Sequence, residues 1–172
     1  MKRLVLLLVF FPLLNFAQES DELNKYFKDN CYIEYPSNWI LNDSDEDEAI
    51  FFLYPNDSES AYIFTENINL IKRPNNSPNI SLEKYKSVVE KEINRLLVDN
   101  KILHSKIEYQ HGLWFHKLIA EGSSDGYKFI TVFYSWLLDK DIYTLTFITL
   151  HKTYENNRIE SLRIMDSFQL NR

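Results

Sequence analysis

The longest run of strand-forming residues covers residues 127–150 and is interrupted only by Asp139, Lys140 and Asp141. Side chains in a strand point alternately to the two faces of a sheet. Both alternating sets of the first arm are largely apolar: Phe129, Thr131, Phe133 and Leu137 on one face, and Ile130, Val132, Tyr134 and Trp136 on the other. A strand of this kind must be covered on both faces. The pattern therefore predicts a long hairpin at the centre of a sheet, with further elements packed on each side.

Shorter strands are predicted before this hairpin. The runs with strand character are residues 31–35, 49–54, 61–71, 102–109 and 113–121. Pro36 ends the first run, because proline lacks the amide needed for the hydrogen-bond ladder. Gln110, His111 and Gly112 form the turn between the last two runs, and residues 122–126 form the next turn before the central hairpin.

Helical spacing of apolar residues appears in three places. Residues 81–98 form the most regular helix, with Ser81 as the N-cap and apolar residues at Leu82, Tyr85, Val89, Ile93 and Leu96. Residues 154–168 are predicted to be a second helix with Ile159, Leu162 and Met165 in one stripe. Residues 21–29 are predicted to be a short amphipathic helix or turn, because Leu23, Tyr26 and Phe27 share helical spacing.

Together these elements predict an α+β fold. Six or seven mostly antiparallel strands form one central twisted sheet, and helices pack on both faces in an α/β/α sandwich. The sequence has no internal repeat and no change of composition that would divide it. We therefore expect a single domain over residues 30–172, preceded by an N-terminal segment at residues 18–29.

The first 17 residues have the pattern of a secretory signal peptide. Lys2 and Arg3 precede an apolar run at residues 4–14, and Ala17 supplies the small residue before the expected cleavage site. The apolar run is too short for a comfortable membrane span. We expect the protein to be exported, and to be periplasmic or fully secreted after cleavage near Ala17.

Charge and composition exclude several classes of function. Without Lys2 and Arg3, 17 basic residues remain against 25 acidic ones, so the net charge changes from −6 to −8. An acidic protein without a concentrated basic surface is not expected to bind nucleic acid. Only three glycines are present, which leaves no glycine-rich phosphate loop, and we expect no cofactor. Cys31 is the single cysteine and is predicted to be a buried, unreactive thiol.

One short motif resembles a catalytic one. Residues 122–126 match the G-x-S-x-G pattern of hydrolases, with Ser124 in the place of the nucleophile. That motif requires a strand before the serine and a helix after it, whereas Tyr127 begins a predicted strand. The interpretation favoured here is a hairpin turn. A hydrolase is the alternative, and it requires Ser124 to lie within hydrogen-bond reach of His151 or another histidine.

Two sets of residues are weak candidates for metal sites. Asp43, Asp45 and Asp47 alternate as the first ligands of a calcium loop do, but Glu48 stands where that loop has glycine. A solvated acidic loop is the favoured interpretation, and weak calcium binding is the alternative.

His111 and His116 lie close together in the sequence, but no third zinc ligand follows from the spacing. They are interpreted as structural or surface histidines.

Aromatic residues make up 15% of the sequence. They either fill a core, which is the commoner use, or line a pocket for a small apolar ligand between the sheet and a helix. The candidates for such a pocket are Trp114, Phe133, Tyr134 and Trp136.

The order of these motifs resembles the PsbP-like family over about residues 30–170. The matching segments are Tyr35-Pro36-Ser37-Asn38-Trp39, the helix start Ser81-Leu82-Glu83-Lys84-Tyr85, the turn Gln110-His111-Gly112 and the closing Met165-Asp166-Ser167-Phe168. The resemblance implies a non-catalytic accessory or binding module, and it supplies no active-site residues. The first hypothesis is therefore an exported module that engages a protein of the envelope, and the alternative is a carrier of a small apolar ligand.

Overall fold

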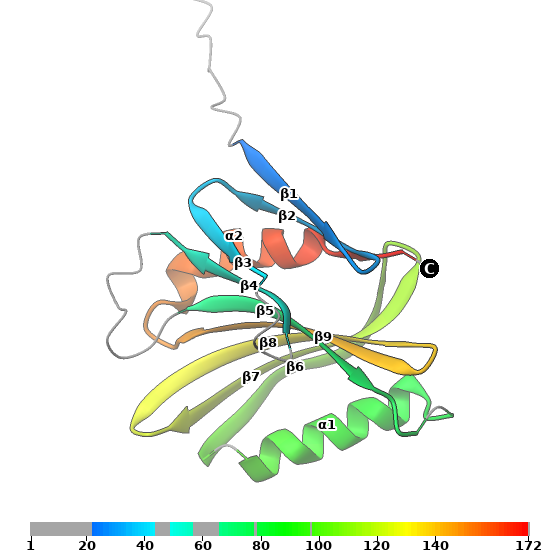
Figure 1. Cartoon of the computed structure of the whole chain (residues 1–172). Helices are drawn as coiled ribbons and strands as arrows, with labels where there is room; N and C mark the ends of the chain where they lie inside the picture. The colour runs from blue at the N-terminus through cyan, green and yellow to red at the C-terminus, as the bar shows by residue number, and fades with distance from the viewer. Residues whose placement is uncertain (1–21, 44–48, 57–65, 78, 97, 172) are drawn as a thin grey trace, which may run out of the picture.

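The structure is a computed structural model that describes residues 22–43, 49–56, 66–77, 79–96 and 98–171. Two helices are present in these ranges, α1 (Leu82–Leu96) and α2 (Tyr154–Ser167). The strands are β1 (Leu23–Lys28), β2 (Cys31–Pro36), β3 (Trp39–Asn42), β4 (Ala49–Pro55), β5 (Asn67–Pro74), β6 (Val98–Gln110), β7 (Leu113–Ser124), β8 (Tyr127–Leu138), β9 (Asp141–Leu150) and β10 (Gln169–Leu170). Figure 1 shows how they are arranged.

Seven of the strands form one antiparallel sheet in the order β3-β4-β5-β9-β8-β7-β6. The predicted hairpin of residues 127–150 is confirmed as β8 and β9, which lie in the middle of this order. Asp139 has a positive φ of 53° in the connecting turn. The preceding turn is shorter than predicted: β7 continues through Gly122, and only Asp125 and Gly126 turn with positive φ.

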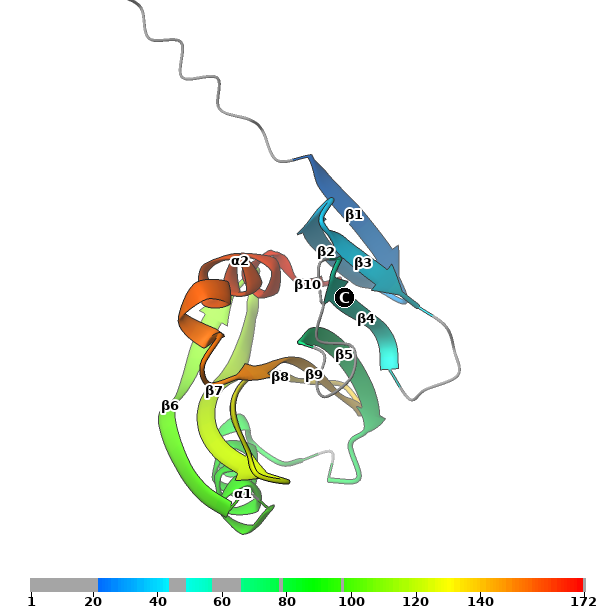
Figure 2. The same ribbon diagram turned by 90° about the vertical axis from the view of Figure 1, so that its left-hand side faces the viewer.

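The sheet has two differently covered faces. The side of β8 that carries Tyr134 and Trp136 faces α2 and is called the α2 face; the side that carries Phe133 is called the α1 face. Figure 2 shows the two helices at opposite ends of the curved sheet, with α1 inside the bend of β6 and β7. Helix α2 contacts β9, which confirms the expected cover on the α2 face of the central hairpin. Helix α1 contacts β6 and β7, and on the α1 face of the hairpin Phe129, Phe133 and Leu137 are only partly buried.

A second, three-stranded sheet in the order β1-β2-β10 adds to the cover of the α2 face. The predicted helix or turn over residues 21–29 is wrong in its described part, because Leu23–Lys28 is a strand paired with β2. Asp29 and Asn30 turn the chain with φ of 48° and 66°, which closes a two-residue hairpin. The ladder to β2 then supplies the main-chain hydrogen bonds that a helix would have made.

The core lies between the α2 face, the three-stranded sheet and α2. Phe115 stacks on Trp136 with ring centroids 5.3 Å apart, and Trp136 contacts Phe168 at 5.0 Å. Cys31 is fully buried, as predicted, and burial raises the pKa of its thiol to about 12. The thiol is therefore protonated and unreactive at neutral pH.

Helix α2 exists as predicted, but its buried stripe differs from the prediction. Ile164 and Met165 are buried with Ser161, whereas Ile159 is 74% exposed. The prediction counted apolar residues only, so it missed the polar Ser161 and placed the buried side of the first turns at Ile159. The small side chain of Ser161 instead lies completely buried against the core.

Helix α1 begins where the sequence predicts. Ser81 caps it, because its hydroxyl accepts a hydrogen bond from the main-chain N–H of Lys84 at 3.2 Å. The helix ends at Leu96, two residues before the predicted end. Of the predicted strand over residues 61–71, residues 61–65 lie outside the described ranges and the rest belongs to β5.

The predicted fold class is confirmed: a central antiparallel twisted sheet has a helix on each face. The three-stranded sheet is an addition that the sequence did not predict. Across the described residues, no helix is long and apolar enough to span a membrane.

Candidate functional site

The turn between β6 and β7, together with the last residues of these strands, is the most distinctive surface feature and is called the hairpin end. His111 and Gly112 form its two-residue turn with φ of 49° and 82°. Gln110 was predicted to be part of this turn, but it is the last residue of β6 and pairs with Leu113. Both turn residues have the left-handed backbone that favours the right-handed twist of a hairpin. This geometry sets the register and places Tyr109 directly opposite Trp114.

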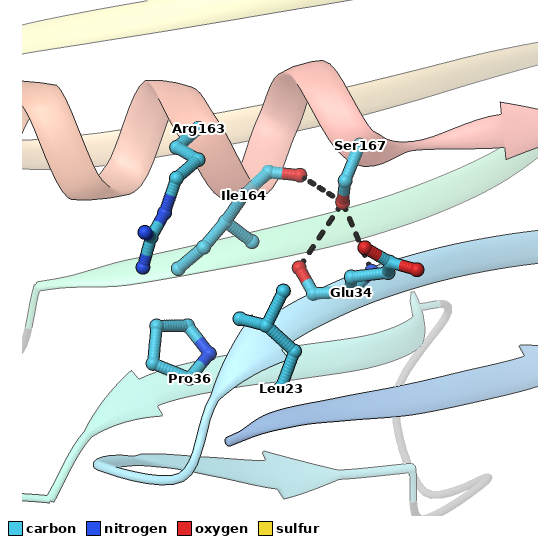
Figure 3. A pocket seen from close by; sticks show the side chains of 6 residues that line it. All are labelled: Leu23, Glu34, Pro36, Arg163, Ile164 and Ser167. Carbon is cyan, nitrogen blue, oxygen red and sulfur yellow. Dashed lines mark hydrogen bonds between the residues drawn. The ribbon is translucent and has the colours of Figure 1, made fainter. Parts of the chain in front are cut away.

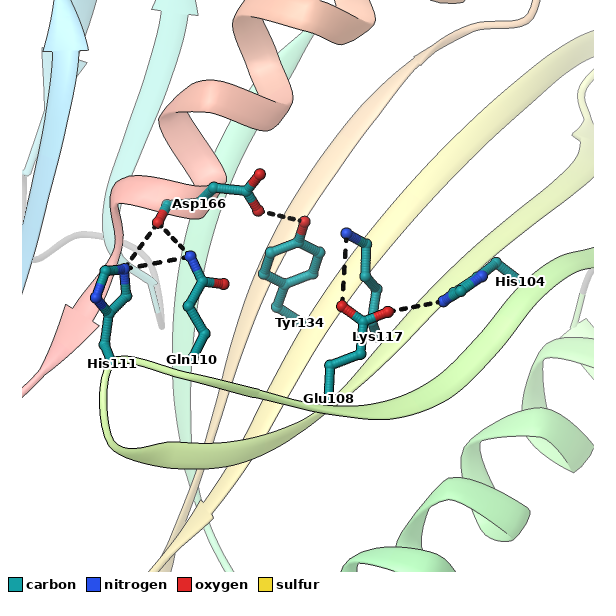
Figure 4. A network of polar contacts seen from close by, with 7 residues as sticks. All are labelled: His104, Glu108, Gln110, His111, Lys117, Tyr134 and Asp166. Atoms are coloured by element: carbon teal, nitrogen blue, oxygen red, sulfur yellow. Dashed lines mark hydrogen bonds and ion pairs between the residues drawn. The ribbon is translucent and has the colours of Figure 1, made fainter.

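Helix α2 holds the hairpin end in place through Asp166 (Figure 4). Gln110 Nε2 and His111 Nε2 donate to the main-chain carbonyl of Asp166 at 2.7 and 2.9 Å. The carboxylate of the same residue accepts a hydrogen bond of 2.8 Å from the Tyr134 hydroxyl. Burial and then the Asp166 charge raise the pKa of Tyr134 above its ordinary value, so the hydroxyl stays protonated and donates.

A second polar group continues along the α2 face from Tyr134. Lys117 Nζ lies 4.8 Å from the centroid of the Tyr134 ring and 3.9 Å from Glu108 Oε2. The other oxygen of Glu108 is 3.0 Å from His104 Nε2. These contacts link β6 and β7 to β8 on the same face, and Figure 4 shows them leading from Asp166 at the end of α2 towards His104.

On the α1 face, the hairpin end carries an exposed aromatic pair. Tyr109 is 59% exposed and Trp114 is 62% exposed, and their ring centroids are 5.0 Å apart. Tyrosine and tryptophan are the residues most enriched where proteins bind other proteins. Because α2 fixes the hairpin end from the opposite side, the two rings are presented on a rigid support.

The four aromatic candidates for a ligand pocket do not come together. Tyr134 and Trp136 are buried on the α2 face, where they pack with Phe115. Trp114 and Phe133 belong to the α1 face. Side chains on opposite faces of one sheet cannot line the same cavity, and two of these four are already used to fill the core.

A small cavity lies at the junction of α2 with the three-stranded sheet (Figure 3). Its volume of about 30 Å³ holds roughly one water molecule. Its lining residues are Leu23, Glu34, Pro36, Arg163, Ile164 and Ser167. The Ser167 hydroxyl accepts from the main-chain N–H of Glu34 at 2.9 Å and lies 2.7 Å from the carbonyl of Ile164. This cavity is a structural junction and is too small for an apolar ligand.

The histidine candidates also lie apart. His116 is 1% exposed on the α1 face, and its Nε2 lies 2.9 Å from the Ser105 hydroxyl. Its Nδ1 is buried without a hydrogen-bond partner, and burial lowers the pKa of its ring to about 4. His111 instead contacts Asp166 at the hairpin end. Within the described residues, no three potential metal ligands form a cluster.

Of the acidic candidates for calcium, only Asp43 lies in the described ranges. Its carboxylate accepts a hydrogen bond of 3.3 Å from the Tyr26 hydroxyl. Asp45 and Asp47 lie outside the described residues, so the predicted calcium alternative stays a prediction.

The geometry around Ser124 does not form a nucleophile with a base. Ser124 lies beside the tight turn of Asp125 and Gly126, and its hydroxyl donates to Asp125 at 3.3 Å. His151 Nε2 lies 3.6 Å from a carboxylate oxygen of Glu121. The hydrolase hypothesis required a histidine within hydrogen-bond reach of Ser124, and each of these two side chains makes its contact elsewhere.

Two features of the hairpin end escaped the sequence analysis. The pairing of Tyr109 with Trp114 follows once the turn is known to contain only two residues, so the sequence held that signal. The role of Asp166 could not be read in the same way, since it is 55 residues from His111 and meets it only after α2 has packed.

Searches of known proteins give matches to solved structures only. No protein-family model matches the sequence, and no curated protein does. Cyanobacterial PsbP (CyanoP) from Synechocystis sp. PCC 6803 is similar with a TM-score of 0.60 at 13% identity, covering 90% of this chain and 96% of that one. LpqN of Mycobacterium tuberculosis, which is involved in cell envelope biogenesis, has a TM-score of 0.66 at 12% identity, covering 90% and 88%.

A Pseudomonas aeruginosa protein of unknown function is similar as well, with a TM-score of 0.56 at 10% identity over 87% of this chain and 97% of that one. Identities this low show a common fold and nothing finer. They confirm the resemblance to the PsbP-like fold that the sequence motifs indicated.

Proposed function

Starting from the PsbP-like fold, we propose that this chain is an exported, non-catalytic accessory module that binds a protein partner of the cell envelope through its hairpin end. The exposed pair of Tyr109 and Trp114 is the observation that carries the proposal. Tyr134 and Trp136 fill the core, whereas Tyr109 and Trp114 face solvent on a rigid support.

The energetics of protein interfaces support this assignment. Truncating a tryptophan or tyrosine at the centre of an interface commonly costs 2 kcal/mol or more of binding free energy, because the ring fills a desolvated pocket of the partner. A rigid aromatic side chain also loses little conformational freedom on binding. The contacts of Gln110 and His111 with Asp166 supply that rigidity before any partner arrives.

The fold neighbours support the class of function and the location. The name of LpqN connects that protein to cell envelope biogenesis, and CyanoP is described as a cyanobacterial PsbP. An envelope location for this chain also agrees with the signal peptide predicted for residues 1–17. Cleavage near Ala17 and the identity of the partner are parts of the proposal.

The proposal is tested by native mass spectrometry of the mature protein purified gently from its own envelope fraction. We expect a second polypeptide to be bound, and to be lost from the double variant Tyr109→Ser with Trp114→Ser. The matched control is Tyr127→Ser, which removes another exposed aromatic ring at the opposite end of the sheet. We expect the control to retain the partner, and the double variant to weaken binding by about 30-fold or more.

Two results would contradict the proposal. One is a small non-covalent mass that is released on denaturation without any bound polypeptide, which would favour the carrier of an apolar ligand. The other is a polypeptide that the double variant and the control retain equally, which would place the binding surface elsewhere on the molecule.

A further inference from the structure

Strand β6 forms one edge of the seven-stranded sheet. It pairs with β7, and no other strand in the described part of the chain pairs with it. Figure 2 shows its outer side facing away from the molecule, with α1 on the inner side. An open edge presents a row of main-chain donors and acceptors to any other extended chain.

The two halves of this edge differ. In the first half the register with β7 shifts twice, between Val98 and Lys101 and between Ile102 and His104. Irregularities of this kind are a common means of preventing strand pairing. From His104 to Gln110 the register is continuous, so seven residues form a regular edge that could accept another strand.

The regular half also carries an uncompensated charge. Lys106 lies directly opposite Lys117 across the β6–β7 pair, and like charges in that position repel. Lys117 contacts Glu108 and the Tyr134 ring, whereas Lys106 has no ion-pair partner among the described residues. Glu108 lies two positions further along the strand, on the same face.

We propose that this regular edge binds the same edge of a second copy of the chain, with a two-fold axis through Ile107. The two β6 strands then run antiparallel and join the two sheets into one. The facing residues are His104 with Gln110, Ser105 with Tyr109, Lys106 with Glu108, and Ile107 with its own counterpart. Each Lys106 thus gains the Glu108 carboxylate of the other copy, and the two half-buried Ile107 side chains cover each other.

The charge pattern selects this register over its neighbours. An axis through Lys106 would place two lysines opposite each other, and an axis through Glu108 would place two carboxylates opposite each other. Both arrangements are repulsive. Interfaces use this combination of attraction in one register and repulsion in the others to achieve specificity. The regular edge shares Tyr109 and Gln110 with the hairpin end, but the inference rests on the open strand edge and on the charges of Lys106 and Glu108, so it does not depend on the identity of an envelope partner.

The test is sedimentation velocity of the purified mature protein from about 1 to about 200 µM, a range that brackets weak association. We expect a reversible monomer–dimer equilibrium. Lys106→Glu and Glu108→Lys should each weaken dimerisation at least tenfold. In either variant, residues 106 and 108 carry the same charge, and they face each other at both of the symmetry-related positions of the interface. An equimolar mixture of the two variants should form a dimer, since their altered edges complement each other.

The control variant is Lys101→Glu, which changes the charge by the same amount on the irregular half of β6. It should dimerise as the unmodified protein does. Lys106→Glu also places a carboxylate opposite Lys117 within one copy, so it is expected to fold. As a second measurement, hydrogen exchange of the amides of residues 104–110 should slow with increasing concentration in the unmodified protein and remain unchanged in Lys106→Glu.

The proposal is overturned if the unmodified protein stays monomeric over the whole range, or if a dimer forms whose strength Lys106→Glu leaves unchanged. Loss of the envelope partner from the Tyr109 and Trp114 double variant would be a separate result. It bears on the proposed function even when the protein is shown to be a monomer.

Discussion

Helices α1 and α2 pack on opposite faces of one sheet in different ways. Helix α1 has the more regular apolar spacing in the sequence, yet no side chain from residue 82 to 95 is fully buried. Helix α2 has a less regular pattern, yet Ser161, Ile164 and Met165 are all buried. Amphipathic spacing therefore identifies a helix, but it does not tell how deeply that helix enters the core.

The difference lies in what each helix contacts. Helix α2 enters an aromatic core between two sheets, so its few apolar residues are enclosed from several sides. Helix α1 lies on one sheet and contacts it partly through polar groups. Lys86 pairs with Glu90 at 2.7 Å, and hydrogen bonds to Lys86 and then Ser105 lower the pKa of Glu90. Ser105 in turn contacts the buried His116.

The largest effect is expected from truncating the buried side of α2. Met165→Ala should lower the free energy of unfolding by about 2 to 5 kcal/mol. The truncation removes buried apolar atoms, whose burial no longer contributes to stability, and it leaves a cavity in the core. Ile159→Ala on the same helix should change the free energy of unfolding by less than about 0.5 kcal/mol, since Ile159 is exposed. Urea unfolding of both variants measures the difference. Equal effects would mean that the two positions are equally buried.

The stability of the protein should depend on pH through His116, which is buried on the α1 face. The folded protein keeps His116 neutral with a pKa of about 4, whereas the unfolded chain protonates it near its ordinary value of 6.5. The unfolded state therefore binds the proton first. Stability is complete above pH 6.5 and is lost as the pH falls towards 4, by about 2 to 3 kcal/mol at pH 4.5.

Urea unfolding at pH 7 and pH 4.5 measures this loss. His116→Gln should remove most of the pH dependence in that interval, while the exposed His151→Gln serves as the control and should retain it. The charged and titratable groups that act on the pKa of His116 are Lys86, Glu90 and His104. The lowered pKa of Glu90 places its own loss of stability at more acid pH than this interval. An unchanged pH dependence in His116→Gln would contradict the assignment.

A smaller effect is expected where α2 meets the hairpin end. Tyr134→Phe removes the hydroxyl that donates to Asp166 and should cost about 1 kcal/mol of unfolding free energy. The carboxylate of Asp166 is exposed, so water can replace the lost donor. Tyr109→Phe is the matched control, because its ring is exposed, and it should be close to neutral. Thermal unfolding compares the two, and a larger loss in Tyr109→Phe would argue against the described role of Tyr134.

The smallest effect is expected at the start of α1. Ser81→Ala removes the cap of the Lys84 amide and should cost about 0.5 to 1 kcal/mol. The control is Ser87→Ala in the same helix, where the hydroxyl only donates back to the carbonyl of Glu83. Alanine is the better helix former there, so this change should be neutral or slightly stabilising. Hydrogen exchange of α1 amides should increase in Ser81→Ala alone.

Several parts of the fold could be read from local sequence. The central hairpin was predictable, because its two long arms alternate over more than 20 residues and Asp139 marks the turn. Residues 23–28 were not predictable in the same way. Leu23 and Phe27 are four positions apart and share a side in a helix and in a strand alike, so only the pairing with β2 decides between the two.

The candidate site was only partly visible in the sequence. Trp114 was singled out as an aromatic candidate, but its assignment to a pocket together with Tyr134 ignored that the two residues lie on opposite faces. Which residues of β7 and β8 share a face depends on the register between the two strands. That register pairs Tyr134 with Lys117, which lies on the face of β7 opposite to Trp114. The surroundings of Tyr134 therefore depended on a register that no local pattern contains.

By itself, the sequence determined features that depend on a few neighbouring residues: the alternation of the strands, the Ser81 cap and the presence of a turn between β6 and β7. The tertiary structure decided which residues face each other. Asp166 fixes the hairpin end because α2 packs across the sheet, and β6 forms an open edge because no other described strand pairs beside it. Such relations follow from long-range packing, whose free energy is spread over many contacts and leaves no local pattern in the chain.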